Sequence, residues 1–245
     1  MTSQADGRVD AGDRATRSFP IVLSGPSGVG KTSIVSVLLG RDSSLRLSVS
    51  ITTRARRASE LAGRDYTYVT REEFAALESA GALVESAAVH GQAYGTPREP
   101  LERWLAAACD VLLDIDYQGG LRIKEVYRDA VLIFLLPPSW QELESRLRGR
   151  RSDPEAEVNR RLQNAAREIA EGERYDYFVM NAALDGAVAE VEAIIAAEWQ
   201  RSARRQIGFG ALIGAPPPLA PLDPLDPRCG RGQLPCCSER KSFSE

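Results

Sequence analysis

The sequence has little cysteine and no long apolar run, and both shortages exclude classes of protein. Four of the 245 residues are cysteine, and three of them, Cys229, Cys236 and Cys237, lie near the end of the sequence. This usage predicts a protein of the reducing cytoplasm without a disulfide framework. No apolar run approaches the roughly 20 residues that cross a bilayer, so we expect no membrane span. The formal net charge of −3 argues against a nucleic-acid-binding surface.

The two ends of the sequence differ in composition from its middle. Residues 1–18 are small, polar and charged, and we expect a disordered lead that lacks an apolar signal core. Residues 208–245 are rich in proline, which disfavours a helix or a central strand, so we expect a disordered tail. The residues between them, 19–207, have the apolar patterning of a folded domain.

Four short apolar runs in this domain predict buried parallel strands. They are residues 19–24, 111–116, 130–136 and 177–181. Helical segments separate them, which predicts an α/β fold with a mainly parallel sheet. The segment 48–96 interrupts this alternation with shorter β-like pieces and one helix. We interpret it as an inserted lobe, which leaves 19–47 and 97–207 as the core of the domain.

Three helix starts are marked by capping patterns. Thr70 with Glu73, and Ser139 with Glu142, each place a hydroxyl three residues before a glutamate, as in a capping box. Thr96 precedes a proline and predicts a third helix start of the same kind, with that proline at the first helical position.

The first predicted strand runs into a glycine-rich motif. The motif reads Gly25-Pro26-Ser27-Gly28-Val29-Gly30-Lys31-Thr32 and matches G-x-x-x-x-G-K-[ST]. With a strand before it and a helix after it, this motif predicts a loop whose backbone N–H groups hold the phosphates of a nucleotide. Lys31 would reach the β- and γ-phosphates, and the hydroxyl of Thr32 would ligate Mg²⁺.

Two acids lie at the end of the second predicted strand. Asp114 and Asp116 stand where an α/β sheet places its ligand groups, and Asp114 is a candidate Mg²⁺ ligand. Asp116 also begins a D-x-x-G pattern that ends at Gly119, as in the switch loop of a GTPase. The guanine-binding N-K-x-D motif of GTPases does not follow, so we disfavour a GTPase.

Residues 48–57, SVSITTRARR, are suited to holding a second phosphate. Arg54 and Arg57 are three residues apart and can fork onto phosphate oxygens. Hydroxyl groups from Ser50, Tyr66 and Tyr94 can complete the shell around such an acceptor phosphate. A second phosphate site favours transfer to an acceptor over hydrolysis.

At this point the sequence resembles the guanylate kinases. The likeness rests on the phosphate loop, on the S-V-S-x-T-T-R-x-x-R segment, on Gly63 with Tyr66, and on Tyr94-Gly95-Thr96, all in the family's order. It extends to about residue 200. The resemblance implies a P-loop nucleoside monophosphate kinase fold and a reversible, Mg²⁺-dependent transfer of a phosphoryl group from ATP to GMP, a step of purine nucleotide metabolism.

The resemblance also implies residues for guanine. Glu85 matches the family's glutamate, which accepts the N1–H and the exocyclic amine of the base, and Thr96 matches its serine or threonine there. Asp116 is a further candidate for the GMP site. Adenine lacks both donors and would leave the Glu85 carboxylate unpaired, so a preference of roughly 10⁴-fold for GMP over AMP is within reach.

An arginine-rich lid is implied over residues 146–161. Arg146, Arg150 and Arg161 match the family's arginines, and with Lys31 and Arg54 they would stabilise the charge that develops on the transferred group. For Arg148 we expect surface salt bridges instead.

The sequence departs from the family's pattern late in the domain. Ala182 stands where the family has an aspartate after Asn181, which leaves the role of Asn181 open.

Two other functions stay open at this stage. One is a guanylate-kinase-like module that binds protein partners without catalysis, which the intact Lys31 and Thr32 disfavour. The other is a related P-loop kinase for a different small phosphate acceptor. The sequence leaves the oligomeric state undetermined.

Overall fold

The computed structural model describes residues 18–58, 60–89, 91–149, 155–201 and 204. Most of the expected lead, all of the expected tail, and residues 150–154 of the expected lid, including Arg150, lie outside these residues.

A five-stranded parallel sheet forms the centre of the fold. Its strands are β1 (Pro20–Ser24), β2 (Arg46–Leu47), β7 (Val111–Asp114), β8 (Val131–Leu136) and β9 (Tyr177–Met180), in the order β2-β7-β1-β8-β9. Every neighbouring pair is parallel, and Leu23 of β1 is in register with Asp114 and Ile133. The predicted α/β fold and its four strands are confirmed. The two-residue strand β2 was not predicted.

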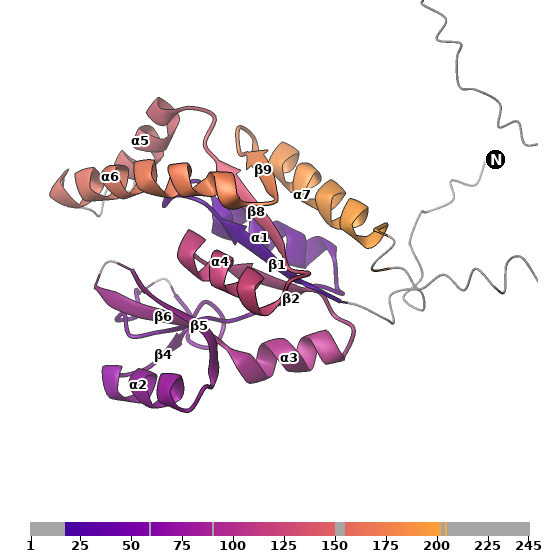
Figure 1. Ribbon diagram of the computed structural model, residues 1–245. Helices are drawn as coiled ribbons and strands as arrows, with labels where there is room; N and C mark the ends of the chain where they lie inside the picture. The colour runs from indigo at the N-terminus through magenta and orange to yellow at the C-terminus, as the bar shows by residue number, and fades with distance from the viewer. Residues whose placement is uncertain (1–17, 59, 90, 150–154, 202–203, 205–245) are drawn as a thin grey trace, which may run out of the picture. The chain divides into compact units, whose positions relative to one another are not determined.

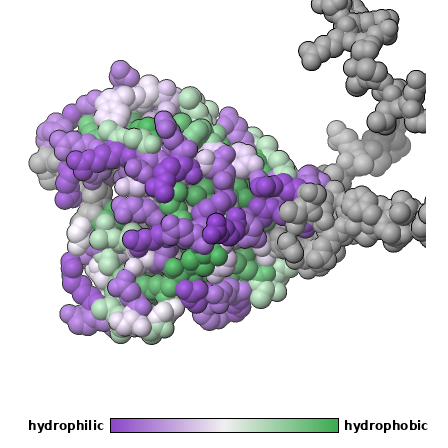
Figure 2. All heavy atoms as spheres, viewed as in Figure 1, coloured by the Kyte–Doolittle hydropathy of each residue, from purple (hydrophilic) through white to green (hydrophobic). Residues whose placement is uncertain are grey.

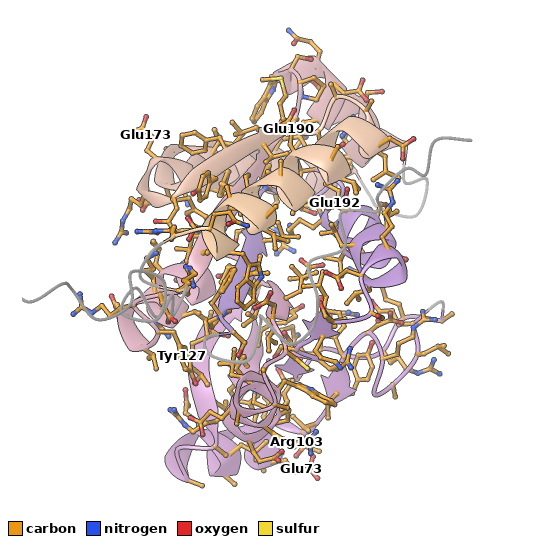
Figure 3. The ribbon with its side chains drawn as sticks, turned by 90° about the vertical axis from the view of Figure 1, so that its right-hand side faces the viewer. Glu73, Arg103, Tyr127, Glu173, Glu190 and Glu192 are labelled. Carbon is orange, nitrogen blue, oxygen red and sulfur yellow. The ribbon has the colours of Figure 1, made fainter. Side chains whose placement is uncertain are left out.

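Helices cover both faces of this sheet (Figure 1). Alternate residues of β1 face opposite sides, and the strand is buried throughout. Ile21 and Leu23 pack against α1 (Lys31–Arg41) and α7 (Leu184–Trp199), whereas Val22 packs against α3 (Arg98–Ala106) and α4 (Tyr117–Val126). Burial on both faces explains why the strand is a continuous apolar run. At the surface, Glu192 of α7, which is labelled in Figure 3, accepts a hydrogen bond of 3.4 Å from Arg41 at the end of α1.

A second sheet comes from the segment predicted as an inserted lobe. It consists of β3 (Ile51–Thr52), β4 (Thr67–Tyr68), β5 (Leu83–Val89) and β6 (Gln92–Pro97), in the order β4-β3-β6-β5. The strand β6 pairs antiparallel with β3 and β5, and α2 (Arg71–Ser79) packs on the sheet through Phe74. Figure 1 shows α4 between the two sheets, and this helix contacts both β5 and β1.

The chain continues from β8 into two helices packed against each other. They are α5 (Trp140–Arg148) and α6 (Glu155–Glu171), and Leu143, Leu147, Val158 and Ala165 form their shared apolar cluster. Hydrophilic side chains dominate the visible surface over α6 (Figure 2). The short 3₁₀ turn η2 (Gly172–Arg174) then leads into β9.

Two of the three predicted helix starts are confirmed. The hydroxyl of Thr70 accepts a hydrogen bond from the backbone N–H of Glu73 at the start of α2. The Glu73 carboxylate in turn accepts one from the backbone N–H of Thr70. The hydroxyl of Ser139 accepts the N–H of Glu142 at the start of α5. Both serve helices whose first N–H groups otherwise lack partners.

The third predicted helix is present as α3, but its predicted cap, Thr96, is wrong. Thr96 belongs to strand β6, and α3 begins two residues later, at Arg98. The hydroxyl of Thr96 donates to the carboxylate of Glu85 on the neighbouring strand and therefore does not cap the helix. Local sequence favoured a cap, but pairing between β5 and β6 supplies a charged acceptor instead.

Candidate active site

The glycine-rich motif forms a turn between β1 and α1 that requires its glycines. Gly25 and Gly30 adopt φ values of 146° and 104°, in the region that side chains disfavour. A Cβ atom on Gly25 would lie 2.5 Å from the Leu135 carbonyl oxygen, and one on Gly30 would lie 2.5 Å from Nδ2 of Asn181. The turn leads directly into the N-terminus of α1, where N–H groups and the helix dipole favour an anion.

The outer side of this phosphate loop is held by two residues distant in the sequence. Nδ2 of the buried Asn181 donates to the Val29 carbonyl at 2.7 Å. Arg146 donates to the same carbonyl at 3.3 Å and to the Asn181 carbonyl at 3.1 Å. The structure thus gives Asn181, whose role the sequence left open, the part of a support for the loop. Arg146 also lies against the loop.

A polar cluster stands at the mouth of the loop. Nζ of Lys31 donates to the Gly25 carbonyl at 2.6 Å, and the Thr32 hydroxyl donates to the Asp114 carboxylate at 3.3 Å. Burial raises the pKa of Asp114, while Lys31 and Thr32 oppose that rise. The hydroxyl and the carboxylate are two hard oxygen groups side by side, the donor chemistry that suits Mg²⁺.

One cavity of about 200 Å³ connects this cluster with the second sheet. Its donor side is formed by Gly25, Ser27, Lys31 and Asp114. Its other walls include Ser50, Tyr66, Glu85, Tyr94, Asp116, Gly119 and Glu168. The cavity therefore brings together residues that the sequence analysis had assigned separately to a phosphate loop and to an acceptor site.

The far end of the cavity holds a buried carboxylate. Glu85 of β5 is 7% exposed, and its Oε1 atom accepts a hydrogen bond of 2.7 Å from Thr96. Burial raises the pKa of Glu85 to about 7, and the nearby Asp116 adds to the rise. Gly119 of α4 approaches so closely that a Cβ atom there would lie 2.9 Å from Oε2 of Glu85. Asp116 caps the same helix by accepting the Gly119 N–H at 2.8 Å.

Two tyrosines stand at another wall of the cavity, and an arginine packs against one of their rings. The rings of Tyr66 and Tyr94 meet edge to face, with centroids 6.0 Å apart. The guanidinium of Arg54 lies 5.3 Å from the Tyr66 ring centroid and pairs with Glu60 at 2.7 Å. Arg57 is more exposed and stands 3.7 Å from the same carboxylate. Neither arginine is among the residues that line the cavity.

Comparison with known proteins assigns the chain to a family. The guanylate kinase family model matches residues 17–198. The chain belongs to the guanylate kinase family. A guanylate kinase of Mesorhizobium japonicum is 50% identical over 207 residues, which cover 84% of this chain and 95% of that protein. A guanylate kinase of Rhodospirillum rubrum is 46% identical over 198 residues, which cover 80% of this chain and 90% of that protein.

A solved structure agrees with this assignment. The guanylate kinase from Anaplasma phagocytophilum matches with a TM-score of 0.66 and 36% sequence identity, covering 81% of this chain and 94% of that one. Because relatives with this name match over most of the chain, and because Lys31 and Thr32 are in place, catalysis is favoured over a protein-binding module.

Two of the three arginines predicted for a lid, Arg146 and Arg161, lie among the described residues. Arg146 lies on α5 against the phosphate loop, and Arg161 lies on α6 and does not line the cavity. Arg150 lies outside the described residues. Arg148 pairs with Glu144 at 2.9 Å and with Glu155 at 2.7 Å, as its predicted salt bridges require.

Among the titratable residues that line the cavity, Glu168 was missed by the sequence analysis. Glu168 of α6 lines the cavity, and burial raises the pKa of its carboxyl, with Lys31 opposing the rise and Asp116 adding to it. Its spacing gave a signal, because Val158 and Ala165 are the buried residues of α6 and Glu168 continues that face. A carboxylate on the buried stripe of an amphipathic helix indicates a functional position.

The structure also limits two kinds of site. Among the described residues, no helix is both long and apolar enough to span a membrane. Within the same residues, no cluster of three or more His, Cys, Asp or Glu side chains could hold a metal ion by itself. A metal at Thr32 and Asp114 would therefore take further ligands from phosphate oxygens or water.

Proposed function

We propose that this protein transfers the γ-phosphoryl group of ATP to GMP and gives ADP and GDP in a reversible reaction. One observation carries the proposal: a single cavity joins the phosphate loop to a buried carboxylate that can read guanine. A nucleotide hydrolase needs the loop but not the second site. The reaction belongs to purine nucleotide metabolism, and the sparse cysteine supports a cytoplasmic setting.

The donor nucleotide is held by the phosphate loop. The backbone of residues 25–32 surrounds the phosphates, and the ammonium group of Lys31 binds the β- and γ-phosphates. The Thr32 hydroxyl and the Asp114 carboxylate would hold Mg²⁺, which supplies charge neutralisation at the phosphate oxygens when bound.

The acceptor nucleotide lies across the cavity. The Glu85 carboxylate accepts the two N–H donors of the guanine edge, while the Thr96 hydroxyl fixes that carboxylate and Asp116 lies beside the base. The GMP phosphate is bound by the hydroxyls and guanidinium groups of Ser50, Arg54, Arg57, Tyr66 and Tyr94. Residues 48–96 thus act as a GMP-binding lobe on the core formed by 19–47 and 97–207.

Transfer proceeds in line between the two nucleotides. An oxygen of the GMP phosphate forms a bond to the γ-phosphorus while the bond from that phosphorus to the β–γ bridging oxygen breaks, which leaves ADP. Five cationic side chains stabilise the charge on the phosphoryl group during its transfer. They are Lys31, Arg54 and the lid arginines Arg146, Arg150 and Arg161. Closure of the lid at 146–161 excludes water and so favours transfer over hydrolysis.

The deciding experiment compares four acceptors. ADP production from ATP is measured with GMP, AMP, CMP and UMP in turn, and we expect GMP to be preferred by roughly 10⁴-fold in kcat/KM. Replacing the loop lysine, Lys31→Met, should abolish turnover with all four. A preference for AMP would contradict the role of Glu85. Nucleotide binding without turnover for any acceptor would favour the protein-binding module instead.

A further inference from the structure

Glu60 is a nearly buried carboxylate that the proposed function does not use. It lies in the segment between β3 and β4, and its side chain is 14% exposed. Oε1 accepts a hydrogen bond of 2.7 Å from Nη2 of Arg54. Oε2 accepts the backbone N–H of Arg57 at 2.9 Å and the hydroxyl of Tyr68 at 2.7 Å. Three donors from three residues thus converge on one carboxylate.

The carboxylate carries its negative charge at neutral pH. Burial alone would raise the pKa of Glu60, but hydrogen bonds from Arg54, from the Arg57 backbone and from Tyr68 lower it to about 2. Glu60 therefore balances one of the two positive charges that Arg54 and Arg57 bring to the acceptor-phosphate site.

Arg54 stands between this carboxylate and the cavity wall. Its guanidinium contacts Glu60 on one side, while the ring of Tyr66 lies 5.3 Å away and the Tyr94 hydroxyl is a further hydrogen-bond partner. Tyr66 and Tyr94 line the cavity, and Glu60 does not. A guanidinium has five N–H donors in a rigid fork, so fixing one edge on Glu60 sets the direction of the other donors.

We propose that Glu60 is a positioning residue for the acceptor phosphate: it fixes the Arg54 guanidinium and the Arg57 backbone from outside the cavity, so that the donors of Arg54 are aimed at GMP. This rests on the proposed function, since it assigns Glu60 to the phosphate half of the GMP site.

A different role for the same carboxylate makes the opposite prediction. If Glu60 occupied the place of the GMP phosphate and had to be displaced, removing its charge would strengthen GMP binding. If Glu60 positions Arg54, removing its charge loosens the guanidinium and weakens GMP binding. The position of Glu60 outside the cavity favours the second outcome.

The test uses the variant Glu60→Gln in the full-length protein, which keeps the shape of the side chain and removes its charge. We expect the KM for GMP to rise about ten-fold, with the KM for ATP within about two-fold of the wild-type value. Glu60→Asp keeps the charge and should recover part of the loss. The control is Glu99→Gln, which removes an ion pair of 3.3 Å with Arg103 on the exposed side of α3 and should change neither KM.

A second variant covers the case in which Glu60→Gln does not fold. Tyr68→Phe removes one donor to Oε2 and leaves every charge in place, and we expect a two- to three-fold rise, roughly, in the KM for GMP alone. An unchanged or lower KM for GMP in the folded variants overturns the proposal, as does an equal rise for ATP. If wild-type protein shows no turnover, the proposed function fails, and calorimetric binding of GMP to the same variants still decides the role of Glu60.

Discussion

The buried carboxyl of Glu85 predicts that GMP binding weakens as the pH falls through 7. Its burial, with Asp116 nearby, raises the pKa to about 7, while Thr96 and Arg122 partly oppose that rise. The guanine edge presents two N–H donors, and an ionised carboxylate accepts both more strongly than a protonated carboxyl, in which one oxygen carries a hydrogen. GMP should therefore bind to the ionised form.

The size of the effect follows from this pKa. About nine tenths of Glu85 is ionised at pH 8 and about one tenth at pH 6, so the apparent Kd for GMP should rise about ten-fold between them. The GMP phosphate has its own second pKa near 6, which adds about a factor of two. Wild-type protein should thus lose about 20-fold in affinity from pH 8 to pH 6, and the variant Glu85→Gln only about two-fold.

Isothermal titration calorimetry with GMP at pH 6, 7 and 8 measures both proteins. At pH 7 the wild type should release about half a proton on binding, visible as a dependence of the heat on the ionisation enthalpy of the buffer. The variant Glu85→Gln should show no such release from this position. The reasoning is refuted if both proteins weaken equally with falling pH, or if wild-type binding at pH 7 releases no proton.

The same pKa predicts how stability depends on pH. A carboxyl whose pKa is 4.5 when exposed and about 7 when folded keeps its proton longer in the folded protein. Its contribution to stability is fully present below pH 4.5 and is lost as the pH rises through 7. Relative to Glu85→Gln, the free energy of unfolding of the wild type should fall by roughly 3 kcal/mol between pH 4.5 and pH 8. Urea unfolding at these pH values measures the difference, and a constant difference would contradict the assigned pKa.

Three further substitutions test other parts of the site. Gly119→Ala places a Cβ atom 2.9 Å from Oε2 of Glu85, so we expect about a ten-fold higher KM for GMP. In urea unfolding the cost of this clash should offset the gain of about 1 kcal/mol that alanine brings to a helix. Asn181→Ala removes a buried donor to the Val29 carbonyl, which should lower the free energy of unfolding by about 1–3 kcal/mol and raise the KM for ATP in the coupled assay. Asp114→Asn should raise the Mg²⁺ concentration needed for half-maximal rate about ten-fold. Titration of Mg²⁺ at a fixed ATP concentration measures this value, and an unchanged Mg²⁺ concentration would show that Asp114 is not a metal ligand.

Most of the central sheet could be predicted from sequence because four of its strands are apolar runs that can be recognised without knowing their neighbours. Strands β1, β7, β8 and β9 are buried on at least one face and read as short apolar runs. The strand β2 was not predicted, and Thr96 of strand β6 was predicted as a helix cap, for a different reason. The first has two residues, and the second reads QAYGTP, where polarity and glycine conceal a strand whose pairing with β3 and β5 is settled at long range.

The residues of the site also differ in whether the sequence alone could identify them. The phosphate loop is a contiguous motif, so its residues could be named from sequence. The support of that loop by Asn181, and the place of Glu168 on the cavity wall, depend on packing between segments that are far apart in the sequence. The hydroxyl of Thr96 shows this most clearly. A threonine that caps a helix and a threonine that donates to a neighbouring strand look alike in the local sequence, and only the pairing of β5 with β6 distinguishes them.

The segment from Asp114 to Gly119 joins the two halves of the site. It begins at the acid beside Thr32 of the phosphate loop and ends at the glycine against the Glu85 carboxylate. Asp116, in its middle, caps α4 and so fixes the first turn of that helix. Because α4 contacts both sheets, one short, capped turn helps to set the distance between the phosphate loop and the Glu85 carboxylate. A two-nucleotide kinase needs that distance fixed, since in-line transfer tolerates little error in the spacing of its substrates.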